Sequence, residues 1–174
     1  MTETAEALVR ALAAEAARQM GKLSRGRIRR CLDELSDEEI WRRPGPTTVS
    51  AGNLVLHLAG NVRQWIVAGL GGASDARVRQ AEFDERGPLP REEILARLDA
   101  SVDEALAVVD ALGPADLLRR YRVQGFDETG VGILVHVVEH FSYHTGQISW
   151  WTKVMKEVDL DYYGEHDLDV TGED

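Results

Sequence analysis

Residues 53–72, NLVLHLAGNVRQWIVAGLGG, decide the fold together with residues 136–154, HVVEHFSYHTGQISWWTKV. In both stretches apolar residues return every three or four positions, which is the spacing of one face of an α-helix. His57 lies in the middle of the apolar face of the first stretch. His140 and His144 lie on the corresponding face of the second. Both stretches are therefore predicted to be long helices that carry imidazoles on their buried sides.

Four long amphipathic segments of this kind make up most of the 174 residues. Ser50 and Thr129 are suitable N-caps for the second and the fourth segment. No stretch shows the alternating pattern of a β-strand. The pattern predicts an all-α fold, a four-helix bundle. The expected helices span 3–35, 50–69, 91–112 and 129–157, and the first should bury the stripe Leu8, Leu12, Ala16, Met20, Leu23 and Cys31.

The composition fits one soluble domain. A chain of this length buries about 70% of the surface that its unfolded form exposes, so it needs no covalent cross-links. The single cysteine, Cys31, cannot form an internal disulfide, which is typical of a reducing cytoplasm. No run of about 18 apolar residues is present, and the first residues lack the basic start of a signal peptide. We therefore expect a cytoplasmic protein without a membrane partner.

The charge is unevenly distributed. Of the net charge of −10, residues 157–174 contribute −8, because they hold eight acidic residues and no Lys or Arg. We expect residues 1–157 to form the bundle and 158–174 to form an acidic, solvated tail. The other 156 residues sum to −2. This balance predicts no basic stripe and hence no nucleic-acid partner.

The histidines are the most informative polar residues. A single His on an apolar face is usually a core residue that is hydrogen-bonded to a carbonyl, and this alternative stays open for His57 taken alone. His140 and His144, four residues apart, are neighbours on one helix. Three imidazoles that bury toward one another would leave several nitrogens without partners unless they bind a metal. Three protein ligands also leave a coordination position for water or substrate.

Three further residues are predicted to lie beside this triad. His136 precedes His140 by one turn, and it is about 12 Å along the axis from His144, too far to share one ion with it. We expect His136 to lie next to the metal ligands or on the substrate side. Asn61 either holds the second nitrogen of His57 or caps a backbone group. Gln147 either orients a ligand or is an ordinary edge residue.

Other polar residues allow two interpretations each. Arg63, Arg77, Arg79 and Glu82 could line the mouth of the site or form surface ion pairs. Glu15 and Gln19 interrupt the apolar stripe of the first helix. They are candidate partners of the site, although a solvated helix edge is the favoured interpretation.

Residues 53–72 and 136–154 resemble the DinB/YfiT-like superfamily of metalloenzymes, most closely a branch known only as a domain of unknown function. The resemblance implies a bundle of up-down-down-up order, often a homodimer. It also implies a Zn, Ni or Fe ion on a triad that corresponds to His57, His140 and His144. The family's ending HRGQ reads HTGQ here, with Thr145 in place of arginine. Helical geometry predicts that Thr145 points away from the core.

Two classes of function follow. The first is a metal-dependent enzyme that activates a small-molecule substrate. The resemblance implies S-transfer from a low-molecular-weight thiol, with hydrolysis by an activated water as the alternative reaction. The second class is a non-catalytic metal-binding or stress-related protein whose triad is structural. Three imidazoles do not select among divalent transition metals. The flank of the fourth helix, with Trp150, is the expected interface of a homodimer.

Overall fold

The computed structural model describes residues 2–164 and 166–172. Helices dominate these residues, so the prediction of an all-α fold is confirmed in its main point. The first long helix joins α1 (Glu3–Ala17), the π-helical η1 (Arg18–Ser24) and α2 (Arg25–Glu34). The second joins α4 (Ala51–Val62) and the π-helical η2 (Arg63–Leu70). The third is α6 (Arg91–Asp110), the fourth is α8 (Gly130–Lys156), and α3 (Asp37–Trp41), α5 (Arg79–Asp84) and α7 (Pro114–Leu118) are short.

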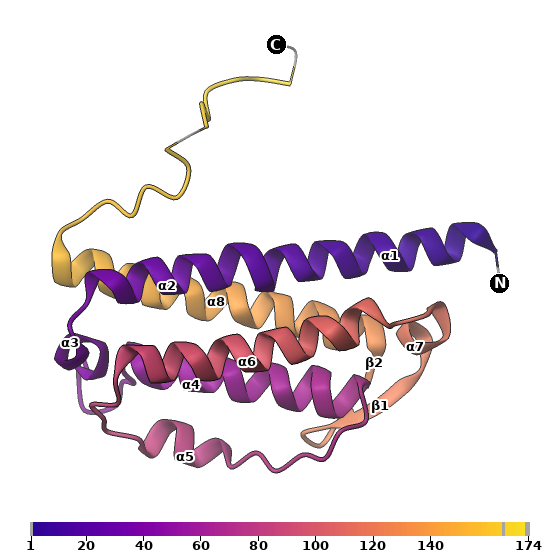
Figure 1. The fold of residues 1–174 in the computed structure, drawn as a ribbon, viewed down its shortest axis with the longest axis horizontal. Helices are drawn as coiled ribbons and strands as arrows, with labels where there is room; N and C mark the ends of the chain where they lie inside the picture. The colour runs from indigo at the N-terminus through magenta and orange to yellow at the C-terminus, as the bar shows by residue number, and fades with distance from the viewer. Residues whose placement is uncertain (1, 165, 173–174) are drawn as a thin grey trace.

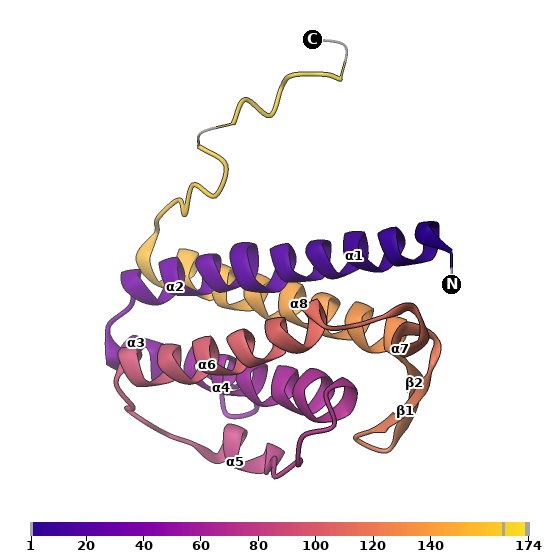
Figure 2. The ribbon, with the colours of Figure 1, turned by 45° about the vertical axis from the view of Figure 1, so that its right-hand side comes forward.

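The four long helices lie side by side (Figures 1 and 2). The first long helix and α8 run in one direction, whereas α4–η2 and α6 run in the other (Figure 1). Because α4–η2 and α6 are parallel, the segment between them must return along the whole bundle. Residues 71–90 make this return and include α5 (Figure 1). This return segment forms one wall of the site described below.

Local signals explain where the two central helices begin. Ser50 and Asn53 form a capping box at the start of α4. The Thr129 hydroxyl accepts a hydrogen bond from the Gly132 amide at the start of α8. Each satisfies backbone amides that would otherwise have no partner in the first turn.

The core lies between the long helices and contains Met20 and Cys31, as predicted. Leu8, in contrast, is 69% exposed, so its place in the predicted stripe was wrong. Val9, not Leu8, lies in line with Ala16 and Met20 along the buried face. After α8, Leu160 is also fully buried. The division at residue 157 therefore stays a prediction, because the first part of the expected tail packs on the bundle.

A short hairpin precedes α8 and was not predicted. Its strands, β1 (Arg120–Val123) and β2 (Phe126–Thr129), pair antiparallel with Val123 opposite Phe126. Gln124 and Gly125 form the turn, both with positive φ, as two-residue hairpins of this kind require. Four residues per strand are too few for an alternating pattern to stand out. Within residues 2–164 and 166–172, no helix is both long and apolar enough to cross a membrane.

Candidate metal centre

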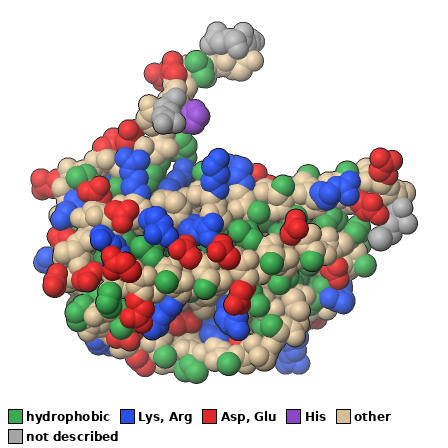
Figure 3. All heavy atoms as spheres, viewed as in Figure 1, with side chains coloured by type: hydrophobic (Ala, Val, Ile, Leu, Met, Phe, Trp, Pro, Cys, Tyr) green, Lys and Arg blue, Asp and Glu red, His purple; other side chains and the backbone are tan. Residues whose placement is uncertain are grey.

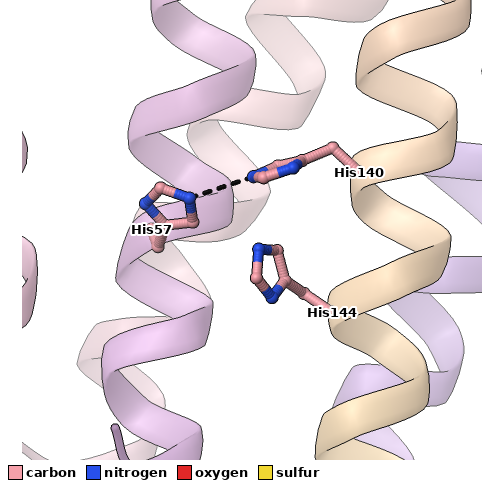
Figure 4. Close-up of side chains that lie close together, drawn as sticks. All are labelled: His57, His140 and His144. Carbon is pink, nitrogen blue, oxygen red and sulfur yellow. Dashed lines mark hydrogen bonds between the residues drawn. The ribbon is translucent and has the colours of Figure 1, made fainter.

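The structure brings His57, His140 and His144 together between α4 and α8 (Figure 4). The Nε2 atoms of His57 and His140 are 2.9 Å apart. One ring nitrogen from each of the three side chains lies within 4.8 Å of the other two. His57 is buried, whereas His140 and His144 are half-buried. The cluster is therefore reachable from solvent along α8.

The outer nitrogen of His57 is held by a buried ion pair in the return segment. Glu82 Oε2 is 2.9 Å from His57 Nδ1, and the same carboxylate accepts hydrogen bonds from Arg77 Nε at 2.7 Å and Nη2 at 2.8 Å. Burial opposes the negative charge of Glu82, but the hydrogen bonds from Arg77 and His57 outweigh it and lower the pKa of the carboxyl. A carboxylate can only accept, so Nδ1 of His57 carries the proton and Nε2 offers its lone pair.

A glycine on α4 makes room for this ion pair. A Cβ placed on Gly60 would collide with Glu82 Oε1 and would lie 2.9 Å from Arg77 Nε. Arg77 and Glu82 thus lie beside the site, which resolves the two interpretations of these residues. Arg63 instead pairs with Glu104 on the surface, and Arg79 stacks on the Phe83 ring at 4.7 Å.

Gln147 holds the outer nitrogen of His144. Its Oε1 atom lies 2.7 Å from His144 Nδ1, so it accepts that proton and leaves Nε2 of His144 as the free nitrogen. Figure 4 shows one nitrogen of the His144 ring turned toward the space between His57 and His140. Of the two interpretations of Gln147, orientation of a ligand is the one that this contact favours.

The surroundings of His140 keep its ring neutral. Burial, reinforced by the neighbouring imidazoles and Arg77, lowers the pKa of His140 to about 3. Burial also lowers the pKa of His144 and of His136 below the ordinary value of 6.5. Neutral imidazole is the form that binds metals.

We expect the metal-free protein to lose stability as the pH falls below about 6.5. Between that ordinary pKa and the value of about 3 in the fold, the unfolded chain binds a proton at His140 that the folded chain does not. The stabilisation is thus complete above pH 6.5 and declines as the pH falls toward 3. Urea unfolding of metal-free protein at about pH 7.5, 6 and 5 measures the slope. A His140→Asn variant with an equally steep slope would contradict this assignment.

His136 and Asn61 lie on the same two helices but do not join the triad. The His136 ring stacks on Trp65, with centroids 4.0 Å apart, and its Nε2 is buried without a hydrogen-bond partner. Asn61 is 3% exposed, and its Oδ1 has no partner among the described residues. The prediction that Asn61 holds the second nitrogen of His57 is wrong, because Glu82 does so.

The prediction for Thr145 is also wrong. Thr145 is only 4% exposed, and its Oγ1 is buried without a partner among the described residues. The reason is that α8 is covered on two sides, by α4 on the side of the histidines and by α2 on another. Ser149, one turn further along, donates to the Thr145 carbonyl and reaches Cys31 of α2. Glu15 and Gln19 bond to each other on the first long helix, as expected for a helix edge.

The three nitrogens fit a divalent metal ion. Imidazole nitrogens bind zinc at about 2.0–2.1 Å, so two that share an ion lie about 3–4 Å apart. The separation of 2.9 Å between two of the Nε2 atoms and the limit of 4.8 Å for the whole group bracket that range. In the part of the chain that the structure describes, no Cys, Asp or Glu joins this group. A position for a non-protein ligand therefore stays open.

A family model described as the DinB superfamily matches residues 20–148. Among solved structures, the chain is similar to a DinB-like protein from Bacillus cereus ATCC 10987, with a TM-score of 0.61 and 16% sequence identity. The similarity covers 79% of this chain and 89% of that one. At such low identity it shows the fold alone. No curated protein matches the chain.

Proposed function

The chain belongs to the DinB superfamily, and from that premise we propose that it is a metal-dependent enzyme whose ion is held by His57, His140 and His144. The supporting observation is the convergence of three imidazole nitrogens within 4.8 Å, with no carboxylate or thiol from the described residues among them. Imidazole ligands suit Zn, Ni and Fe. Glu82 and Gln147 fix the orientation of two of the rings.

The proposed reaction is S-transfer from a low-molecular-weight thiol to an electrophilic small molecule. When bound, the metal would supply a Lewis acid that favours the deprotonated form of the thiol. The sulfur then forms a bond to the electrophilic carbon, and the leaving group departs with its electron pair and takes up a proton. Glu82, the carboxylate beside the triad, is already bonded to Arg77 and His57 and cannot serve as a free base. Thiolate attack needs none, and this favours S-transfer over hydrolysis.

Neighbouring side chains have defined roles in this proposal. Phe83, whose ring centroid lies 4.8 Å from that of His57, shields the triad on the side of the return segment. His136, whose Nε2 is buried and has no partner among the described residues, is the residue proposed to hydrogen-bond the substrate.

Protein purified without a histidine tag tests the proposal. We expect about one metal ion per chain, and turnover of thiol-plus-electrophile pairs that stops on chelation and returns when metal is added back. His140→Ala should have neither metal nor turnover. Metal without turnover of thiol pairs, but with ester or amide hydrolysis, would support the alternative reaction. Metal with no turnover of either kind would favour a non-catalytic protein with a structural triad.

We also propose that the protein is a homodimer joined through the outer face of α8. Four apolar side chains on that face are more than half exposed. They are Val135, Tyr143, Trp150 and Val154. Light scattering should give twice the chain mass of 19.3 kDa.

Trp150→Glu should shift this dimer to a monomer, because a charge would be buried in the interface. Leu118→Glu, at an equally exposed apolar residue on α7, should leave the mass unchanged. A monomer mass for the unmodified chain over a wide concentration range would reject the dimer.

A further inference from the structure

The first long helix carries a basic run that the overall charge conceals. Residues 18–30, RQMGKLSRGRIRR, hold six Lys or Arg and no acidic residue, although the whole chain has a net charge of −10. Blue side chains gather along the upper edge of Figure 3, over this part of the helix. The expectation that the chain has no basic stripe was therefore wrong, because it rested on summed charge rather than on local clustering.

Two of these six cations are neutralised by α6. Arg25 Nη1 lies 2.6 Å from Asp103 Oδ1, and Arg29 Nη2 lies 2.5 Å from Asp99 Oδ2. A third, Arg18, pairs with Glu15 on its own helix. The other three, Lys22, Arg27 and Arg30, line a groove of about 610 Å³ between this helix and the residues that follow α8.

These three groove cations form no ion pair with an acidic side chain among the described residues, and two of them are held in place by neutral groups. Arg27 donates to the Tyr163 hydroxyl at 2.6 Å. Its guanidinium also lies over the rings of Tyr162 and Tyr163, 4.9 and 5.2 Å from their centroids. Arg30 donates to the Asp161 carbonyl at 3.2 Å. Each guanidinium keeps donors that these bonds do not use. The groove thus presents positive charge that no carboxylate of the described chain neutralises directly.

We propose that this groove binds a phosphate-bearing small molecule. Guanidinium forks match phosphate oxygens in geometry and charge, and Arg27 and Arg30 lie one turn apart on one helix face. Lys22, one turn earlier, adds a mobile ammonium. The tyrosines supply an aromatic wall for the organic part of the ligand. Because α6 borders the basic run with Asp99 and Asp103 and the chain as a whole is acidic, a short anion fits this surface better than a long polyanion.

Isothermal titration of the full chain with inorganic pyrophosphate tests the proposal. We expect saturable binding at one site. Lys22→Gln and Arg30→Gln should each weaken it about tenfold or more, because each removes a charge-assisted contact. Arg122→Gln is the matched control. Arg122 is exposed on the hairpin and makes no hydrogen bond or ion pair within the described part of the chain, so its loss should leave the affinity unchanged.

A second pair of variants blocks the groove without removing charge. A Cβ added at Gly26 meets no atom within 4 Å, and Gly26 lines the groove on α2. Gly26→Gln therefore places a side chain in the groove. It also replaces a helical glycine by a better helix former, so the fold should not suffer. We expect Gly26→Gln to lose pyrophosphate binding and Gly26→Ala to keep it.

Three further titrations distinguish phosphate binding in the groove from binding at the triad, from a general affinity for anions and from occupancy by the acidic end of the chain. His140→Ala should bind pyrophosphate normally, and loss of binding in that variant would place the phosphate at the histidine triad instead. Citrate that bound as tightly as pyrophosphate would reduce the groove to a general anion patch and overturn the assignment to phosphate. Binding that appeared only after Asp167→Asn and Asp169→Asn would overturn it as well, because the acidic end would then be the occupant. The absence of pyrophosphate binding in the unmodified chain would overturn the proposal.

Discussion

Alanine at His140 or at His144 is expected to empty the metal site, whereas His136→Ala should keep most of the metal. The three histidines of α8 follow one another at steps of four residues, but only two of them face α4 at His57. The ring centroids of His140 and His144 lie 5.0 and 5.2 Å from that of His57. The His136 ring stacks on Trp65 instead and is not part of the cluster of ligand atoms.

Metal content per chain in the three purified variants measures this difference. Loss of a hydrogen-bond partner outside the ligands lowers metal affinity by about 10–100-fold, and loss of a ligand itself should lower it further. Circular dichroism before metal analysis shows that each variant is folded. If His136→Ala emptied the site and His144→Ala did not, the assignment of ligands would be wrong.

The fold was largely readable from the sequence because its long helices are amphipathic and begin at recognisable caps. Ser50 and Thr129 are caps in the structure as in the prediction. The hairpin escaped because its strands are only four residues long. Thr145 was misplaced because one periodic stripe was assumed for α8, whereas this helix is buried on two sides.

The site was readable only where helical periodicity applies. His57, His140 and His144 could be placed because each lies on a periodic apolar face. Arg77 and Glu82 lie mainly in or near irregular chain, and no spacing rule says which side of the bundle such a segment covers. A weak signal existed, since a metal-binding His usually donates its second nitrogen to a carboxylate. The basic run of residues 18–30 was plain in the sequence but was lost in the net charge.

Removal of the Glu82 carboxylate should have the second large effect, on both stability and metal affinity. The side chains of Arg77 and Glu82 are only 5% and 12% exposed. Glu82→Ala leaves the Arg77 guanidinium buried without its counter-charge, which costs about 3–5 kcal/mol. It also removes the acceptor that orients His57, which should weaken metal binding about 10–100-fold. Asp127→Ala is the matched control. Its partner Arg120 is 61% exposed, so the loss should be about 1 kcal/mol or less.

A double variant separates the two effects of Glu82. Arg77→Met with Glu82→Leu removes both charges and replaces them with apolar side chains, so most of the stability should return. The acceptor for His57 Nδ1 is still missing, however, and metal affinity should therefore stay low. Urea unfolding of metal-free protein and competition with a chelator measure the two quantities independently. If the double variant recovered its metal affinity along with its stability, Glu82 would act only by holding the return segment in place and not by orienting the imidazole.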